Sequence, residues 1–190
     1  MSPAGIRGLN RRIPWLTIVV LAATVAVTMG QAVMPELLPA LRRQPSMVVD
    51  GQVWRFATAW LVHDEGFKQI AVNFPLLAVA GTLAEWVFAP CIWLLAYVLA
   101  GLAGEVAGLF WQPVGAGNSV ATLGLVGLVV GWWSYLSGGP VPQRVVTALA
   151  VLALAIWLTF AHDIHGPALL VGLLVGQVAV RLPRRAGGRV

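Results

Sequence analysis

Ser119 and His165 are the two side chains of this sequence whose types fit acyl-transfer chemistry. Ser119 follows a glycine-rich stretch and opens an apolar run that predicts a helix. Free backbone N–H groups at a helix N-terminus can stabilise an oxyanion, so a serine there is placed to act as a nucleophile. His165 opens another apolar run and can accept the hydroxyl proton if the two helices pack together. The pair predicts serine hydrolysis without a metal or a cofactor.

Each of these residues also has a purely structural interpretation. A serine at the start of a helix is most often an N-cap, and a single histidine at a helix end often bonds a neighbouring helix. Two amides favour the catalytic interpretation, because Gln69 and Asn73 are four residues apart and share one helix face. Together with the backbone N–H of Ser119, beside Gly117, they can donate hydrogen bonds to an oxyanion.

The elements that must position these residues lie in a membrane. Of the 190 residues 59% are hydrophobic and only 10% are charged, which is far more apolar than a soluble domain. The net charge of +5 comes mostly from arginines near the two ends, and it indicates membrane topology and contact with the lipid bilayer, not nucleic-acid binding. A single cysteine, Cys91, excludes an internal disulfide, and the three histidines lack the spacing of a zinc site.

Six apolar runs are predicted as membrane-spanning helices. They form one membrane domain, residues 13–180, between a cytoplasmic amino-terminal segment, 1–12, and a basic cytoplasmic tail, 181–190. We therefore expect an all-α bundle with both chain ends on one side of the membrane. The predicted spans are Ile13–Met34, Phe67–Phe88, Cys91–Trp111, Ser119–Leu136, Arg144–Ala161 and Ile164–Val180.

The arginine distribution predicts the orientation of this bundle. Most arginines lie in the terminal segments and in the connection between the fourth and fifth spans, and the positive-inside rule places these parts in the cytoplasm. The second, fourth and sixth spans then begin on the other side, together with the long polar loop that follows the first span. Polar residues inside a span cost free energy unless they are paired or hydrated, so a group at one depth predicts a shared, hydrated site. That group is Gln69, Asn73, Ser119 and His165.

Small residues allow the spans that carry this site to approach each other closely. They are Gly124, Gly127 and Gly131 on the fourth span and Ala168, Gly172 and Gly176 on the sixth. We expect backbone-to-backbone packing of the two spans, which would bring Ser119 and His165 within hydrogen-bond range. Glu105, between two glycines of the third span, is a candidate functional carboxylate, but a protonated and locally bonded carboxyl is the favoured interpretation.

In this order the residues resemble the rhomboid family of intramembrane serine proteases over nearly all of residues 51–176. The resemblance implies a six-helix protease that cleaves transmembrane protein substrates near the outer membrane boundary with a Ser119–His165 dyad. Substrates would enter laterally between the second and fifth spans. The motifs are Trp54-Arg55 and His63 in the loop, Asn73 and Gly81-Thr-Leu-Ala-Glu85 on the second span, Gly117-Asn118-Ser119 followed by Gly124 and Gly127, and His165 followed by Ala168, Gly172 and Gly176.

Structural roles are expected for four of the motif residues. Trp54 and Arg55 would brace the long loop at the membrane surface, where aromatic rings and arginine stems are common, and His63 in the same loop is expected to be structural and not catalytic. Glu85 lies near the inner end of the second span and would accept hydrogen bonds that hold helix ends together. The composition is typical of a high-GC bacterium, so the inner membrane is the expected location.

Two residues depart from the family's pattern. Val120 stands where a glycine normally follows the nucleophile, and Gln69 stands where many members have a histidine that helps to bind the oxyanion. Gln69 can still donate a hydrogen bond, but Val120 adds bulk beside the nucleophile. The alternative is therefore an inactive rhomboid-like protein that binds membrane-protein partners. A small transporter is disfavoured, because inverted repeats are not visible.

Overall fold

The computed structural model describes residues 12–135 and 141–181, and every regular element within these ranges is a helix. The all-α membrane class predicted from the sequence is confirmed. Both predicted terminal segments and much of the connection before residue 142 lie outside the described residues.

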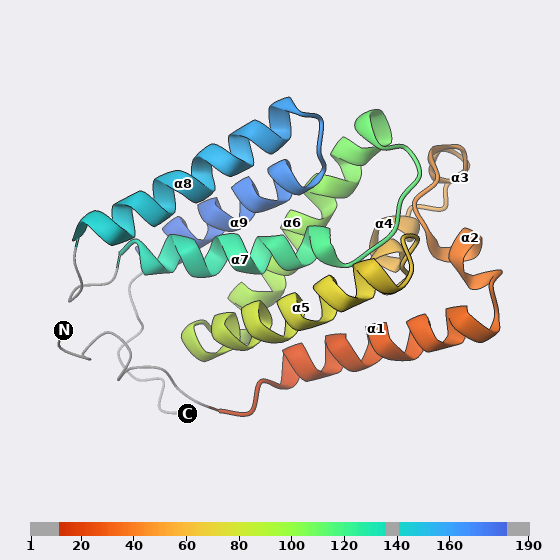
Figure 1. Cartoon of the computed structure of the whole chain (residues 1–190), viewed down its shortest axis with the longest axis horizontal. Coiled ribbons are helices and arrows are strands. Elements are labelled where there is room, and N and C mark those ends of the chain that lie inside the picture. Colours follow the sequence, from red (N-terminus) through yellow and green to blue (C-terminus); the bar gives the residue numbers. More distant parts are fainter. Residues whose placement is uncertain (1–11, 136–140, 182–190) are drawn as a thin grey trace.

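The elements, shown in Figure 1, are α1 (Trp15–Val33), α2 (Leu37–Leu41), α3 (Pro45–Val49), α4 (Arg55–Thr58), the 3₁₀ turn η2 (Ala59–Leu61), α5 (Phe67–Val87), α6 (Pro90–Trp111), α7 (Ser119–Trp133), α8 (Val141–Phe160) and α9 (His165–Ala179).

Helices α1, α5, α6 and α8 are long and apolar enough to cross a membrane. Helices α7 and α9 are apolar but shorter, with 15 residues each. The count of six spans stays a prediction, although all six predicted runs are helical. Helix α8 starts earlier than predicted, at Val141, because Pro142 lies in its first turn, where the missing N–H of a proline costs nothing.

The predicted long loop, residues 35–66, is mostly short helices and not irregular chain. Arg55 holds these pieces together from a buried position. Its Nε donates to Gln52 Oε1 at 2.8 Å, and its Nη1 donates to the carbonyls of Pro39 and Arg42, both at 2.9 Å. Because the last carbonyls of α2 have no partner within their own helix, the guanidinium supplies the missing donors.

Glycines set the closest helix contact in the fold, between α7 and α9. A Cβ added at Gly172 would lie 2.1 Å from the carbonyl oxygen of Gly124, and one at Gly127 would lie 2.6 Å from that of Leu169. Backbone therefore packs directly on backbone, as predicted from the small-residue seams. Helix α7 also packs against α5 and α6, so the helix that begins at Ser119 lies at the centre of the bundle.

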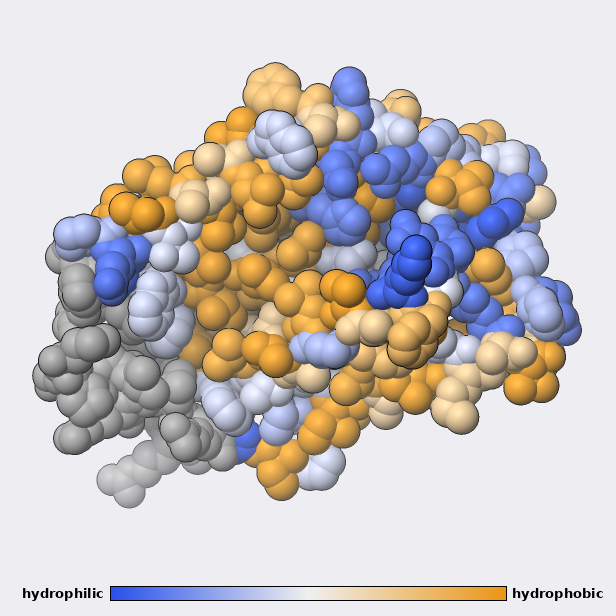
Figure 2. Space-filling model, in the orientation of Figure 1, coloured by the Kyte–Doolittle hydropathy of each residue, from blue (hydrophilic) through white to orange (hydrophobic). Residues whose placement is uncertain are grey.

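The hydropathy of the surface changes along the bundle axis. Figure 2 shows hydrophobic residues over the middle of the bundle and hydrophilic residues gathered at the end where α2 to α4 and the loop before α7 lie. Exposed large apolar side chains occur on every long helix, for example Val79 on α5, Phe110 on α6 and Trp157 on α8. Such a surface is suited to lipid, and the hydrophilic end marks the side of the membrane on which α5, α7 and α9 begin.

Candidate active site

Ser119 and His165 meet at one end of the α7–α9 contact. Each is the first residue of its helix, and the Ser119 hydroxyl lies 2.8 Å from Nε2 of His165. The close glycine packing of the two helices holds these first turns side by side, so the distance is a consequence of Gly124 and Gly172. A hydroxyl hydrogen-bonded to an imidazole is the arrangement needed for general-base activation of a nucleophile.

The site lies where two helices are too short to span the bilayer alone. Fifteen residues make a helix of about 22 Å, whereas the hydrocarbon core is about 30 Å thick. If the carboxyl ends of α7 and α9 reach one membrane boundary, Ser119 and His165 lie below the opposite membrane surface. Polar groups at that depth need contact with water or with protein partners.

Two cavities adjoin the serine and the histidine. The smaller, of about 140 Å³, is lined largely by polar groups that include Arg43, Asp64 and Glu105. The larger is a groove of about 470 Å³ that runs between α5 and α8, with apolar walls that include Leu158. Ser119 and His165 line both cavities, so they lie where a polar chamber meets an apolar groove.

Asn73 and Gln69 face the same glycine of the loop before α7. Gly117 has a φ of +136°, a conformation that favours glycine, and a Cβ there would lie 2.3 Å from Gln69 Nε2 and 3.5 Å from Asn73 Nδ2. Asn73 is buried, and its Nδ2 has no hydrogen-bond partner among the described residues. A buried donor without a partner is costly, so Asn73 offers a ready hydrogen bond to a ligand.

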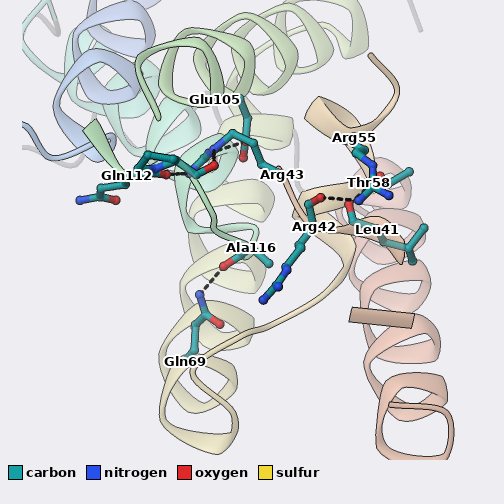
Figure 3. Close-up of polar contacts among 10 residues, drawn as sticks. Leu41, Arg42, Arg43, Arg55, Thr58, Gln69, Glu105, Gln112 and Ala116 are labelled. Carbon is teal, nitrogen blue, oxygen red and sulfur yellow. Dashed lines mark hydrogen bonds and ion pairs between the residues drawn. The ribbon is translucent and has the colours of Figure 1, made fainter. Parts of the chain in front are cut away.

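Gln69 is not a free donor in this state. Its Nε2 donates to the carbonyl of Ala116 at 2.7 Å, and its Oε1 accepts a hydrogen bond from the backbone N–H of Glu65 at 3.3 Å. Figure 3 shows the Gln69 amide turned toward the Ala116 carbonyl in the loop that leads to Ser119. One of the two Nε2 hydrogens is thus engaged, and the second remains for a bound group.

Asp163 is a further site residue, although the sequence alone marks it only as a loop charge. Its Oδ1 accepts hydrogen bonds from Nδ1 of His165 at 2.6 Å and from the backbone N–H of His165 at 2.9 Å. The hydrogen bond from the His165 ring holds the pKa of the Asp163 carboxyl below its usual value, against the opposing effect of partial burial. An acidic residue two positions before a histidine that starts a helix is a sequence signal that could have revealed it.

A buried ion pair holds the loop between α6 and α7. Arg43 and Glu105 are both 1% exposed and bond through Nη1 and Oε2, as Figure 3 shows. Arg43 Nη2 also donates to the carbonyl of Gln112, and the backbones of Arg43 and Gly115 pair in an antiparallel bridge. The expectation of a locally bonded Glu105 was therefore wrong, because its partner lies 62 positions away in the sequence.

Val120, which follows Ser119, fills a space left by a glycine and also lines the polar cavity. It is 2% exposed and packs with Ala100, Ile164 and Ala168. A Cβ at Gly104 of α6 would lie 2.2 Å from Val120 Cγ1, so the missing side chain of Gly104 makes room for the valine. The bulk that the sequence suggests at a tight spot is thus accommodated by a neighbouring helix.

The loop motif residues lie away from Ser119. Trp54 is exposed beside the buried Arg55. His63 is 1% exposed, its Nδ1 lies 3.1 Å from the Thr28 hydroxyl, and its ring packs edge-on against Phe74. Burial lowers the pKa of His63 to about 4, so the ring is neutral near pH 7. These contacts join the long loop to α1 and α5 and place His63 in the framework of the protein.

Glu85 lies at the other end of α5 and caps the start of α1. Its two carboxylate oxygens accept hydrogen bonds from the backbone N–H groups of Leu16 and Thr17 and from the Thr17 hydroxyl, all between 3.0 and 3.1 Å. Negative charge at a helix N-terminus is favourable, and three polar donors are satisfied at once. Among the described residues no group of three or more His, Cys, Asp or Glu side chains is arranged to hold a metal ion.

Comparison with known proteins adds a family relationship to this geometry. The model of the Rhomboid domain matches residues 50–185, which contain α5 to α9 and the candidate site. The rhomboid protease GluP of Bacillus subtilis (strain 168) is 30% identical over 89 residues, and these are 46% of this chain and 17% of that protein. The matched stretch thus spans less than a fifth of that relative's length.

Proposed function

The chain belongs to the rhomboid family, and on that premise we propose that it is a serine endopeptidase acting inside the membrane. It hydrolyses peptide bonds of transmembrane proteins near the outer membrane boundary. The observation that carries the proposal is the 2.8 Å contact between Ser119 Oγ and His165 Nε2 at the junction of a polar cavity and an apolar groove. The apolar groove can accommodate a substrate helix, and the polar cavity can accommodate the unwound segment of that helix.

The reaction follows from the positions of three groups. His165 Nε2 takes the proton from Ser119 Oγ as the oxygen attacks the substrate carbonyl carbon. The oxyanion accepts hydrogen bonds from the Ser119 backbone N–H, which has no partner within its helix, and from Asn73 Nδ2. The second Nε2 hydrogen of Gln69 is the third donor.

Collapse of the tetrahedral intermediate breaks the peptide C–N bond. The imidazolium gives its proton to the leaving amine, and an acyl group remains on Ser119 Oγ. Water then adds to the acyl carbon while His165 takes a proton from it. His165 passes this proton to Ser119 Oγ as the ester bond breaks. The polar cavity beside Ser119 is large enough to hold the few water molecules that this step needs.

Labelling by a fluorophosphonate probe tests the nucleophile directly. Purified wild-type protein in detergent is expected to be labelled and to cleave a model transmembrane substrate. Ser119→Ala should remove both signals, and His165→Ala should slow both by about 10³-fold or more. A wild-type protein that is folded but neither labelled nor active would favour the alternative, a rhomboid-like protein that binds membrane-protein partners without hydrolysis.

Asn73 and Val120 provide tests that separate binding of the oxyanion from packing. Asn73→Ala should lower kcat by about 10²-fold with the substrate KM little changed, as expected for one oxyanion donor. Val120→Gly should lower the melting temperature without raising activity, because Val120 fills the space beside Gly104. An increase in kcat for Val120→Gly would show that the valine obstructs the site.

The proposed topology places both chain ends in the cytoplasm and the site on the other side of a bacterial inner membrane. The support is the arginine distribution and the start of α7, where Ser119 lies, at the hydrophilic end of the bundle (Figures 1 and 2). Alkaline phosphatase fused after Val190 should be inactive and green fluorescent protein at the same point should fluoresce. The reverse pattern would contradict the orientation.

A further inference from the structure

Asp163 occupies the position of a third member of the site. It lies in the turn between α8 and α9, at the end of the chain segment that delivers His165 to Ser119. The chain of contacts runs from Ser119 Oγ to His165 Nε2 at 2.8 Å, and from His165 Nδ1 to Asp163 Oδ1 at 2.6 Å. The two ring nitrogens are therefore bonded on opposite sides by a hydroxyl and a carboxylate.

We infer that Asp163 is a positioning residue that fixes the tautomer of His165 and stabilises its protonated form, which turns the Ser119–His165 pair into a triad. The inference rests on the proposed function for its catalytic meaning and on these two contacts for its geometry. A two-member site would leave Nδ1 of the histidine without a fixed partner. Here the partner is an anion.

The tautomer follows from the inventory of donors and acceptors. A neutral imidazole carries one N–H and one lone pair, and an ionised carboxylate only accepts hydrogen bonds. Nδ1 facing Asp163 must therefore carry the hydrogen, and Nε2 facing Ser119 must carry the lone pair. This is the tautomer that can remove the Ser119 proton. When Nε2 is protonated in the reaction, the carboxylate lies against the positive ring and stabilises it.

The local structure makes this contact rigid. The same Asp163 oxygen accepts the backbone N–H of His165 at 2.9 Å, so the carboxylate is fixed to the first turn of α9. The preceding residue, His162, has a φ of +58° and packs against the Trp111 ring of α6 at 5.4 Å between centroids. A strained turn held against α6 keeps the Asp163 carboxylate against Nδ1 of His165.

The alternative is that Asp163 only caps the start of α9. Asp and Asn accept such local hydrogen bonds equally well, and Ser does so with a shorter side chain. A cap alone predicts that Asp163→Asn behaves as wild type. The inferred role predicts the opposite, because the amide introduced by this substitution carries no negative charge. It also cannot enforce the Nδ1–H tautomer of His165, since its own N–H₂ can donate to Nδ1.

The decisive experiment compares Asp163→Asn and Asp163→Ser with a charge-matched control, Asp50→Asn, in the full-length chain. Asp50 follows α3 in the long loop. We expect Asp163→Asn and Asp163→Ser to lower kcat on a model transmembrane substrate by about 10²-fold with KM changed less than threefold, and Asp50→Asn to be unaffected. Melting temperatures show whether each variant keeps its fold.

The pH dependence gives a second readout. Loss of the carboxylate removes the anion that stabilises the protonated ring, so the acidic limb of the kcat/KM profile should move to lower pH in Asp163→Asn. Other charged groups near His165 are Glu65 and Lys68 along the groove and Asp64, Arg43 and Glu105 around the polar cavity, and these are unchanged in the variant. An unmoved limb with wild-type kcat would overturn the inference.

Histidine nitrogen NMR decides the question without catalysis. The chain has three histidines, so ¹⁵N-histidine spectra can be assigned with His63→Gln and His162→Gln variants. Wild-type His165 should be the Nδ1–H tautomer at neutral pH, and Asp163→Ser should abolish that preference. A wild-type His165 without the Nδ1–H tautomer refutes the triad. Absence of probe labelling with the tautomer present refutes the proposed protease and leaves the contact with Asp163 established.

Discussion

Helices α1 and α8 are the least buried of the long helices and lie at opposite edges of the bundle (Figure 1). In each, 11% of the apolar stretch is buried, so burial does not distinguish them. Their polar contacts differ at the end of the bundle where Ser119 lies. Helix α1 is bonded to Glu85 at its start and to His63 at the Ser119 end, whereas the Thr159 hydroxyl at that end of α8 bonds to a carbonyl of α8 itself.

The difference indicates which edge can move. Lipid tails are as apolar as leucine side chains, so apolar contact alone holds a helix weakly in a membrane, and polar bonds and close packing decide the rest. Helix α1 has such bonds at both ends. Helix α8 packs mainly against α9, where Gly166 brings the two backbones together, and contributes Leu158 to the groove that leads to Ser119. We expect the groove to open between α5 and α8, and α1 to stay fixed.

Locking α8 to α5 should have the largest effect. Val72 on α5 and Leu158 on α8 line the groove, and cysteines at both positions can be joined by a short bifunctional thiol reagent in a Cys91→Ser background. We expect the link to abolish cleavage of a transmembrane substrate while a small fluorophosphonate still labels Ser119. Cleavage at the wild-type rate after complete linking would show that substrates do not pass between α5 and α8.

The matched control locks the other edge. A Cβ at Gly81 would lie 3.3 Å from Thr17 Cβ, which is close to the separation in a disulfide, so Thr17→Cys with Gly81→Cys can join α1 to α5. This disulfide should leave cleavage within about threefold of its reduced form. A strong loss on oxidation would mean that α1 moves during turnover and that the two edges are alike.

Acid should loosen the α1 edge selectively. The pKa of His63 is lowered by burial from 6.5 to about 4, so the folded protein stays unprotonated there while the unfolded chain takes up a proton below pH 6.5. Stability is therefore lost as the pH falls from 6.5 to 4, by up to about 3 kcal/mol. Thermal unfolding at a series of pH values measures this slope, and His63→Gln should flatten it. A slope that is the same in His63→Gln would assign the acid sensitivity to other groups.

Removing the cap of α1 should destabilise the protein somewhat less. Glu85→Ala leaves the N–H groups of Leu16 and Thr17 and the Thr17 hydroxyl without their carboxylate, at a cost of about 1–3 kcal/mol. Thermal unfolding in detergent measures the loss, with Glu85→Gln as an intermediate that keeps one acceptor oxygen. Probe labelling of Ser119 below the melting temperature should not change, because the cap lies at the far end of α5. No change in melting temperature would show that α1 is held by packing alone.

Shortening a side chain of α8 that lines the groove should have the smallest effect. Leu158→Ala removes a half-buried side chain from α8 and should cost less than about 1 kcal/mol in stability, since its site is open on one side. We expect cleavage of a transmembrane substrate to become about two- to fivefold faster and labelling by a small probe to stay the same. Initial rates at saturating substrate measure the first quantity. Slower cleavage would indicate that Leu158 contacts the substrate productively.

The sequence predicts the framework of the site because that framework depends on repeating local patterns. Apolar runs give the helices, and small residues at helical spacing fix the register of α7 against α9. That register places Ser119 beside His165. The four-residue spacing of Gln69 and Asn73 places their two amides on one face of α5. Gly117, two residues before Ser119, has a φ of +136°, a conformation that favours the glycine found there.

The features that the sequence does not reveal depend on pairs distant in the chain or on a single side-chain rotamer. Arg43 and Glu105 belong to a loop and a helix whose contact no periodicity predicts. The Gln69 amide could turn to the site or to Ala116, and only the packed structure decides. The sequence does not single out Asp163, because a charged residue in a short turn is ordinary and its contact with the His165 ring depends on the strained backbone of the turn.

The fit of Val120 into the space at Gly104 couples two positions on different helices. A Cβ at position 104 would lie 2.2 Å from Val120 Cγ1 and 2.7 Å from the Ile164 carbonyl oxygen, so substitutions at positions 104 and 120 should be non-additive in their effect on stability. The size of the residue that follows Ser119 is therefore governed by the helix against which it packs.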